Sequence, residues 1–176
     1  MSNQLCSVPK SIAVGICLSL LSILLGFSLG GAFGVAEDSI KNQIKVSGDA
    51  VLQSIYKGDV KARDAVVKKS WEYLKRAHLH GGAIGTASLA SITILILLCR
   101  LGFVAQVSAV SFGAGSLLYS LFWLLAGFMA PGLGSTGAAK ESLSFIAIPG
   151  AGLSIMGVCG TIFSVAKTCF FRSSES

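Results

Sequence analysis

The sequence predicts an all-α, polytopic membrane protein: four transmembrane helices with an amphipathic helical hairpin between helices 1 and 2. Two observations carry this prediction. The 176-residue chain is 53% hydrophobic and only 12% charged, with a mean hydropathy of +0.76, which excludes a disordered chain and an ordinary soluble domain. Of its 22 charged side chains (14 basic plus 8 acidic), 15 lie within residues 37–80. The rest of the chain is therefore expected to be solvated by lipid.

The transmembrane spans follow from the charge-free runs. A helix needs about 20 apolar residues to cross a hydrocarbon layer of roughly 30 Å. The run 101–139 is too long for one helix, and Pro131-Gly132 with Gly134 forms a breaker cluster, so this span should end near Ala130 and a loop should follow over 131–141. We expect a single membrane domain over residues 1–176, with spans at about 11–36, 81–99, 101–130 and 142–166.

The first charge-free run has an alternative interpretation as a cleaved signal peptide, because Gly34 and Ala36 are small residues just before Glu37. A span is favoured, since the run is longer than the usual apolar core of a signal peptide. Gly26, Gly30 and Gly34 also recur every four residues, a spacing that lets a neighbouring helix approach closely.

Small residues recur at the same spacing in the second and third spans. Lipid provides little hydrophobic drive between helices, so close van der Waals packing of small residues must hold a bundle together. We therefore expect helix packing within one chain at these positions, with a dimerisation face as the alternative. The packing residues expected here are Gly81, Gly85, Ala105, Ala109 and Gly113.

The polar segment 37–80 is expected to form a helical hairpin, because its apolar residues keep helical spacing on both sides of a turn at Lys57-Gly58-Asp59. After the turn, the second helix should run into the second span without a break, since no proline intervenes. The hairpin would pack on itself as a small coil, lie in the headgroup layer, or dock on a partner subunit. The stripe before the turn is Ile40, Ile44, Ser47, Val51 and Ile55; the stripe after it is Val67, Trp71, Leu74 and His78.

Sidedness stays open at the level of the sequence. Four spans place four Lys and Arg residues on the side of both termini and ten on the side of the hairpin, which favours a cytoplasmic hairpin. The flanks of the first span, which often dominates orientation, are nearly tied.

Both histidines lie where the hairpin enters the membrane, at His78 and His80. Residues i and i+2 of a helix point about 200° apart, so the two rings cannot share one metal on a regular helix. Met129, at the end of the third span, should return to the same membrane face. His78, His80 and Met129 are therefore candidate haem ligands, and the two histidines candidate copper ligands. The alternative is a histidine that only hydrogen-bonds a carbonyl.

Other catalytic and transport signals are weak. The chain has no nucleotide-binding glycine motif, no H-E-x-x-H and no C-x-x-C among its five cysteines, and the expected spans hold no Asp, Glu, Lys or Arg. These observations favour a non-catalytic protein over an enzyme. The basic residues are interleaved with acidic ones, which favours anionic lipid over nucleic acid as a partner.

The leading expectation is a small integral membrane subunit or accessory protein of the inner or plasma membrane. Its hairpin would contact the lipid bilayer, a membrane protein partner or a second copy of the chain. A haem- or copper-binding redox protein is the alternative, and an oligomeric channel or carrier comes third.

Overall fold

The computed structural model describes residues 8–98 and 101–170, which form five α-helices and no strand. Four of the helices, α1, α2, α3 and α5, are long and apolar enough to cross a membrane. The predicted all-helical class with four candidate spans is therefore confirmed. The elements are α1 (Lys10–Asp49), α2 (Val60–Leu97), α3 (Phe103–Met129), α4 (Thr136–Ser142) and α5 (Ser144–Phe170).

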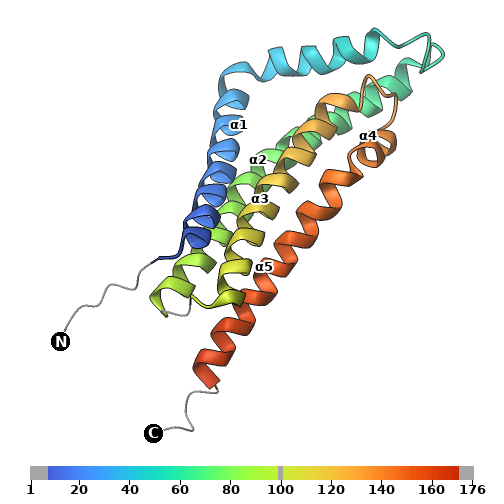
Figure 1. Cartoon of the computed structure of the whole chain (residues 1–176). Helices are drawn as coiled ribbons and strands as arrows, with labels where there is room; N and C mark the ends of the chain where they lie inside the picture. Colours follow the sequence, from blue (N-terminus) through green and yellow to red (C-terminus); the bar gives the residue numbers. More distant parts are fainter. Residues whose placement is uncertain (1–7, 99–100, 171–176) are drawn as a thin grey trace, which may run out of the picture.

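Helix α1 contains a sharp bend that divides it into two parts. Ala36 has φ −136° and ψ 22°, outside the helical region. The part before Ala36 runs along the bundle, and the part after it turns away and crosses one end of the molecule (Figure 1). Because the charged segment begins at Glu37, the chain turns where its apolar run stops.

The second part of α1 ends at Asp49, so the expected helical stripe is wrong at Val51 and Ile55, which lie in the turn that occupies residues 50–59. The turn ends with Lys57 and Gly58 at φ 54° and 79°, a left-handed conformation that glycine adopts without strain.

Helix α2 begins at a capped residue and continues without a break. The Asp59 carboxylate accepts a hydrogen bond from the amide of Ala62 at 3.0 Å, a standard N-cap arrangement. From there α2 runs for 38 residues through Gly81-Gly82, about 57 Å at 1.5 Å per residue. One rigid helix therefore carries both the charged segment and an apolar span.

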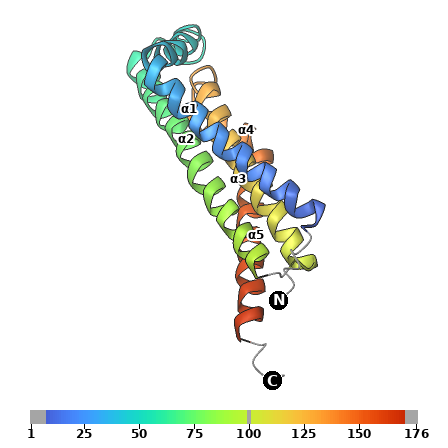
Figure 2. The same cartoon turned by 90° about the vertical axis from the view of Figure 1, so that its left-hand side faces the viewer.

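Helix α3 lies at the centre of the bundle and packs against α1, α2 and α5 (Figures 1 and 2). Helix α5 packs mainly along α3, and α1 and α5 do not touch in the described part of the chain. The beginning of α1 and the end of α5 lie at the same end of the bundle, opposite the turn 50–59 (Figure 1).

Helices approach each other through glycine. A Cβ added to Gly26 of α1 would lie 2.6 Å from the amide nitrogen of Gly82, and one added to Gly81 would lie 2.9 Å from the carbonyl oxygen of Ser22. On α3, a Cβ at Gly113 would lie 2.5 Å from the carbonyl of Gly15. The backbones are in direct contact at these points, and any side chain would push the helices apart.

The other glycines and alanines expected to pack are placed as follows. A Cβ on Gly85 would meet Ile23 at 2.9 Å, and Ala105 and Ala109 are buried. A Cβ on Gly30 would meet the ring of His78 at 2.7 Å, whereas Gly34 has no atom within 4 Å of such a Cβ.

Serine hydroxyls fill the remaining polar positions between the helices. The Oγ atoms of Ser19 and Ser88 lie 2.8 Å apart across α1 and α2, and both side chains are fully buried. Ser22 donates to the carbonyl of Gly81 at 3.2 Å. Hydrogen bonds of this kind add a modest stabilisation, on the order of 0.6–2 kcal/mol each, in a membrane environment.

The loop expected over 131–141 contains one short helix, α4. Ser135 precedes it, and its hydroxyl accepts hydrogen bonds from the amides of Gly137 at 3.1 Å and Ala138 at 3.4 Å. Small and polar residues at 135–137 are typical of a segment that interrupts a helix. In the structure, Ser135 instead caps a helix that starts immediately after it.

We predict that Gly26→Ala destabilises the bundle by about 1–3 kcal/mol, because the added methyl group would overlap the α2 backbone. The matched control is Gly34→Ala, two helical turns away in the same helix, where the methyl group meets open space. Thermal unfolding of both variants in mild detergent would measure the difference. Equal stability of the two variants would contradict the close contact between α1 and α2.

Candidate functional site

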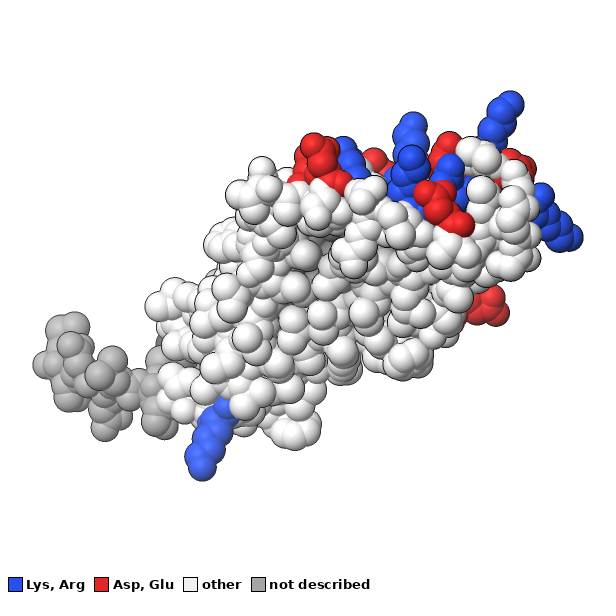
Figure 3. All heavy atoms as spheres, turned by 90° about the horizontal axis from the view of Figure 1, so that it is seen from above, with Lys and Arg blue, Asp and Glu red and all other residues white. Residues whose placement is uncertain are grey.

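Most charged side chains gather at one end of the molecule (Figure 3). We call residues 37–80 the charged cap: the second part of α1, the turn 50–59 and the first part of α2. The visible surface away from the cap is largely uncharged. The cap is therefore the part of the protein that presents polar chemistry to its surroundings.

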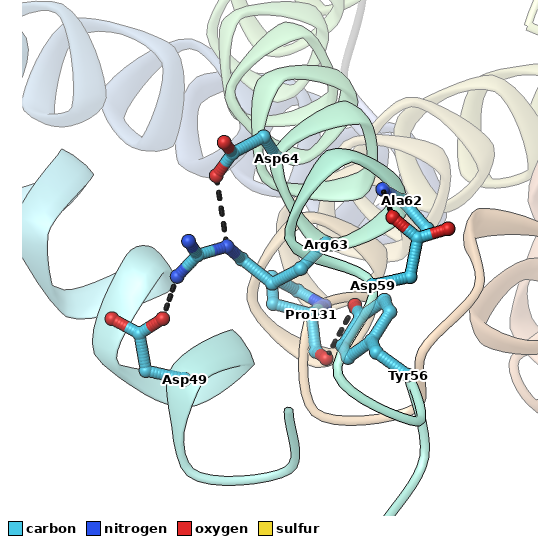
Figure 4. Close-up of polar contacts among 7 residues, drawn as sticks. All are labelled: Asp49, Tyr56, Asp59, Ala62, Arg63, Asp64 and Pro131. Atoms are coloured by element: carbon cyan, nitrogen blue, oxygen red, sulfur yellow. Dashed lines mark hydrogen bonds and ion pairs between the residues drawn. The ribbon is translucent and has the colours of Figure 1, made fainter. Parts of the chain in front are cut away.

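Arg63 joins the two helices of the cap (Figure 4). Its side chain is only 6% exposed, and its guanidinium forms ion pairs with Asp49 at the end of α1 and with Asp64, the latter at 2.8 Å. The aliphatic part of Arg63 lies over Gly48, where a Cβ would be 3.2 Å from its Cγ. Removal of either carboxylate would leave a buried cation short of a partner, which is costly.

Tyr56 docks the turn of the cap onto the loop between α3 and α4 (Figure 4). Its hydroxyl donates to the carbonyl oxygen of Pro131 at 2.9 Å, and the side chain is buried. Ile55 contacts Gly134 in the same loop. Burial raises the pKa of Tyr56 above its ordinary value of 10.0. The cap is thus fixed to the bundle at its far end as well as through the helices.

A groove of about 450 Å³ lies between the two helices of the cap. Its polar lining includes Lys41 and Lys45 from α1 and Asp64, Lys68 and Glu72 from α2, and Trp71 contributes an aromatic wall. The Lys41 ammonium lies 5.1 Å from the centre of the Trp71 ring, within the range of a cation–π contact.

The two carboxylates of the groove are already paired with cations outside it. Asp64 pairs with Arg63, and Glu72 pairs with Lys75 at 2.8 Å. The hydrogen bond from Lys75 is the main cause that lowers the pKa of Glu72. Glu72 is therefore neutralised by Lys75, whereas Asp64 shares the single charge of Arg63 with Asp49.

His78 faces α1. Its Nδ1 lies 2.7 Å from the carbonyl oxygen of Gly26, and its ring packs over Gly30 and edge-on to Phe33 with ring centres 6.0 Å apart. If Nδ1 carries the proton, it donates this hydrogen bond and the ring is held in one orientation. The geometry matches a histidine that bonds a helix carbonyl.

His80 faces α3, on the other side of α2. It stacks on Tyr119 with ring centres 5.2 Å apart and meets Trp123 edge-on at 6.2 Å. Tyr73 completes the group, with its ring 4.9 Å from that of Trp123, and the Arg76 guanidinium lies over Trp123 at 4.9 Å. This aromatic cluster packs the end of the cap on α2 against α3.

The residues considered as cofactor ligands are not brought together. His78 and His80 contact different helices, and Met129 is a 37% exposed side chain at the end of α3. In residues 8–98 and 101–170, no group of three or more His, Cys, Asp and Glu residues is arranged to hold a metal ion. No protein-family model, curated protein or solved structure matches the chain.

Two features of the site were missed by sequence reasoning. The spacing of residues gives no sign that the charged side chain of Arg63 is buried, and the facing of Lys41 and Lys45 toward Lys68 depends on how the turn 50–59 and the bend at Ala36 place two helices. Spacing along one helix carries no information about a contact between two helices. Gly48, opposite Arg63, was the only available signal, because a glycine leaves room for a long side chain.

We predict that Tyr56→Phe lowers stability by about 1 kcal/mol near pH 8, because the Pro131 carbonyl loses its donor. Burial raises the pKa of Tyr56, so the folded state favours the neutral phenol. Its contribution is fully present below about pH 10 and is lost as pH rises through the raised pKa. Thermal unfolding of wild type and variant from pH 7 to 11 should show a gap that closes at high pH. A gap that stays constant would contradict the raised pKa of Tyr56, and no gap near pH 8 would contradict the hydrogen bond.

We also predict that His78→Ala destabilises the protein by about 1–3 kcal/mol, since it removes a hydrogen bond and a packed ring between α1 and α2. The control is Leu79→Ala. Leu79 is 60% exposed, so this substitution should lower the free energy of unfolding by less than about 0.5 kcal/mol. Denaturant titration in detergent would compare them. A result in which Leu79→Ala is the more harmful variant would contradict the placement of His78.

Proposed function

We propose that the chain is a small multi-pass protein of the inner or plasma membrane, without catalytic activity of its own, that acts as a subunit or accessory protein. In this proposal the charged cap is an amphipathic helical hairpin at the membrane surface that contacts a partner protein or the lipid. The observation that carries the proposal is that the cap is rigidly fixed, through Arg63 and Tyr56, yet leaves most of its charged side chains exposed.

The apolar exterior of the bundle supports insertion into a membrane. Phe103 is 81% exposed and Ile148 is 72% exposed, and large apolar side chains are exposed on all four long helices. Such a surface is unfavourable in water and favourable in a hydrocarbon layer. The polar groups between the helices are mostly serine hydroxyls bonded to carbonyls or to each other.

The use of the acidic groups in the cap supports a non-catalytic role. Glu37 pairs with Lys41, Glu72 with Lys75, and Asp49 with Arg63. Asp59 caps α2. Carboxylates engaged in this way stabilise the cap, whereas acid–base catalysis needs carboxylates that converge on a shared substrate.

The proposed topology predicts two sides. In a variant with its five cysteines replaced by serine, a cysteine at Lys61 or Lys140 should react with an impermeant maleimide from one side of sealed vesicles. A cysteine at Lys10 or Lys167 should react only from the other side, because four spans return the chain to the side where it began. Labelling of all four positions from the same side would contradict the four-span insertion.

The proposed contact is tested with a photo-crosslinking residue at Lys61 or Lys69 in the cap, and at Lys167 as the matched position at the other end. Cross-links to a discrete protein should form from the cap and not from Lys167, whereas cross-links from the cap to lipid headgroups alone would favour the lipid surface as its contact. Equal cross-linking from both ends would contradict a role for the cap. A Soret band or copper content lost in His78→Ala would instead favour the haem or copper alternative.

A further inference from the structure

We propose that the groove between the two helices of the charged cap is a binding site for the phosphate headgroup of an anionic phospholipid. Lys45 and Lys68 would contact the phosphate, and Trp71 would pack against the glycerol part of the lipid. The inference rests on the proposed membrane insertion and adds a site and a ligand class to it.

The charge balance of the groove favours an anion. Its two carboxylates, on Asp64 and Glu72, are paired with Arg63 and Lys75, which do not line it. Lys41 pairs with Glu37. Lys45 and Lys68 are exposed and form no ion pair among the residues that the structure describes. Arg63 is shared between Asp49 and Asp64, so these three groups carry one net negative charge. Lys45 and Lys68 bring the groove and its paired neighbours to a net charge of +1, with both ammonium groups facing the groove, an arrangement that attracts phosphate.

The groove lies where the apolar part of the molecule begins. Trp71 in its wall packs edge-on against Phe33, with ring centres 4.9 Å apart, and Phe33 comes three residues before the bend at Ala36. Tryptophan is enriched at the level of the lipid headgroups. A phosphate held beside Trp71 would therefore lie at the depth of the neighbouring lipid phosphates.

The face of α2 that lines the groove continues toward the apolar span. Lys68, Glu72, Lys75, Leu79 and Gly82 lie within about 40° of one direction on this helix, at 100° per residue. The charged side chains on this face end at Lys75: Leu79 is 60% exposed, and a Cβ on Gly82 would have no atom within 4 Å. An acyl chain attached to a headgroup in the groove would pass Lys75 and then find an apolar and open path along this face.

The position of the groove favours a headgroup over an acidic helix of a partner protein. The groove has a volume of about 450 Å³, which leaves room for a phosphate with its glycerol. Trp71 places Lys45 and Lys68 at the level of the lipid headgroups, where phosphate is the abundant anion.

The test uses the full chain in mild detergent with short-chain phosphatidylglycerol, and with phosphatidylcholine as the neutral lipid. Bound lipid is counted by native mass spectrometry, and binding is followed by tryptophan emission. We expect saturable binding of phosphatidylglycerol and an emission change that is absent in Trp71→Phe. Lys45→Gln with Lys68→Gln should weaken binding about 25-fold, or about fivefold for each lysine lost.

The matched control is Lys69→Gln with Lys140→Gln, which removes the same charge from exposed positions outside the groove and should change affinity less than twofold. Equal weakening by both double variants would overturn the site in favour of diffuse surface charge. Equal affinity for phosphatidylcholine would overturn the role of charge. Binding of glycerol phosphate or of a polyglutamate peptide as tightly as the lipid would overturn a lipid site in favour of a soluble anion or an acidic partner.

The outcome is separable from the proposed function. If the two-sided labelling holds and no lipid binds in the groove, the groove inference alone fails. If all four labelled positions react from one side, the membrane insertion fails first, and lipid binding in detergent then reports a soluble lipid site.

Discussion

The backbone contact between α1 and α2 at Gly26 and Gly81 is the constraint on which the rest of the structure depends. With no side chain on either residue, the two helices touch along their backbones. The close approach of the two helices brings the imidazole of His78 within hydrogen-bond distance of the Gly26 carbonyl and lets Ser22 donate to the carbonyl of Gly81. The same approach sets where α1 leaves the bundle, and thus where its second part lies over α2.

The cap is organised by the opposite kind of interaction. Where the bundle is held by small residues and short hydrogen bonds, the cap is held by one buried guanidinium between Asp49 and Asp64, by the Tyr56 hydroxyl and by Trp71. A buried cation tolerates few alternative arrangements, because each of them would leave it unpaired. The cap therefore keeps a defined shape although most of its surface is polar.

The features that depend on local composition could be predicted from the sequence. The four long apolar helices follow from charge-free runs, and the unbroken α2 follows from the lack of proline in it. The predicted helical stripe included Val51 and Ile55 on the basis of spacing alone. It is wrong there because Tyr56 and Ile55 pack on the loop after α3. The groove could not be predicted for the same reason. Lys45 and Lys68 lie 23 positions apart, and the facing of their side chains depends on how the turn 50–59 and the bend at Ala36 place the two helices.

The peripheral position of α5 bears on how the chain assembles. Helix α5 is made after α1, α2 and α3, and it packs mainly on α3 through glycines such as Gly150, where a Cβ would lie 2.9 Å from the Tyr119 amide. The α1, α2 and α3 contacts are complete without it. A nascent chain can therefore form a three-helix core before α5 has left the ribosome, and α5 then packs onto a surface that is already built.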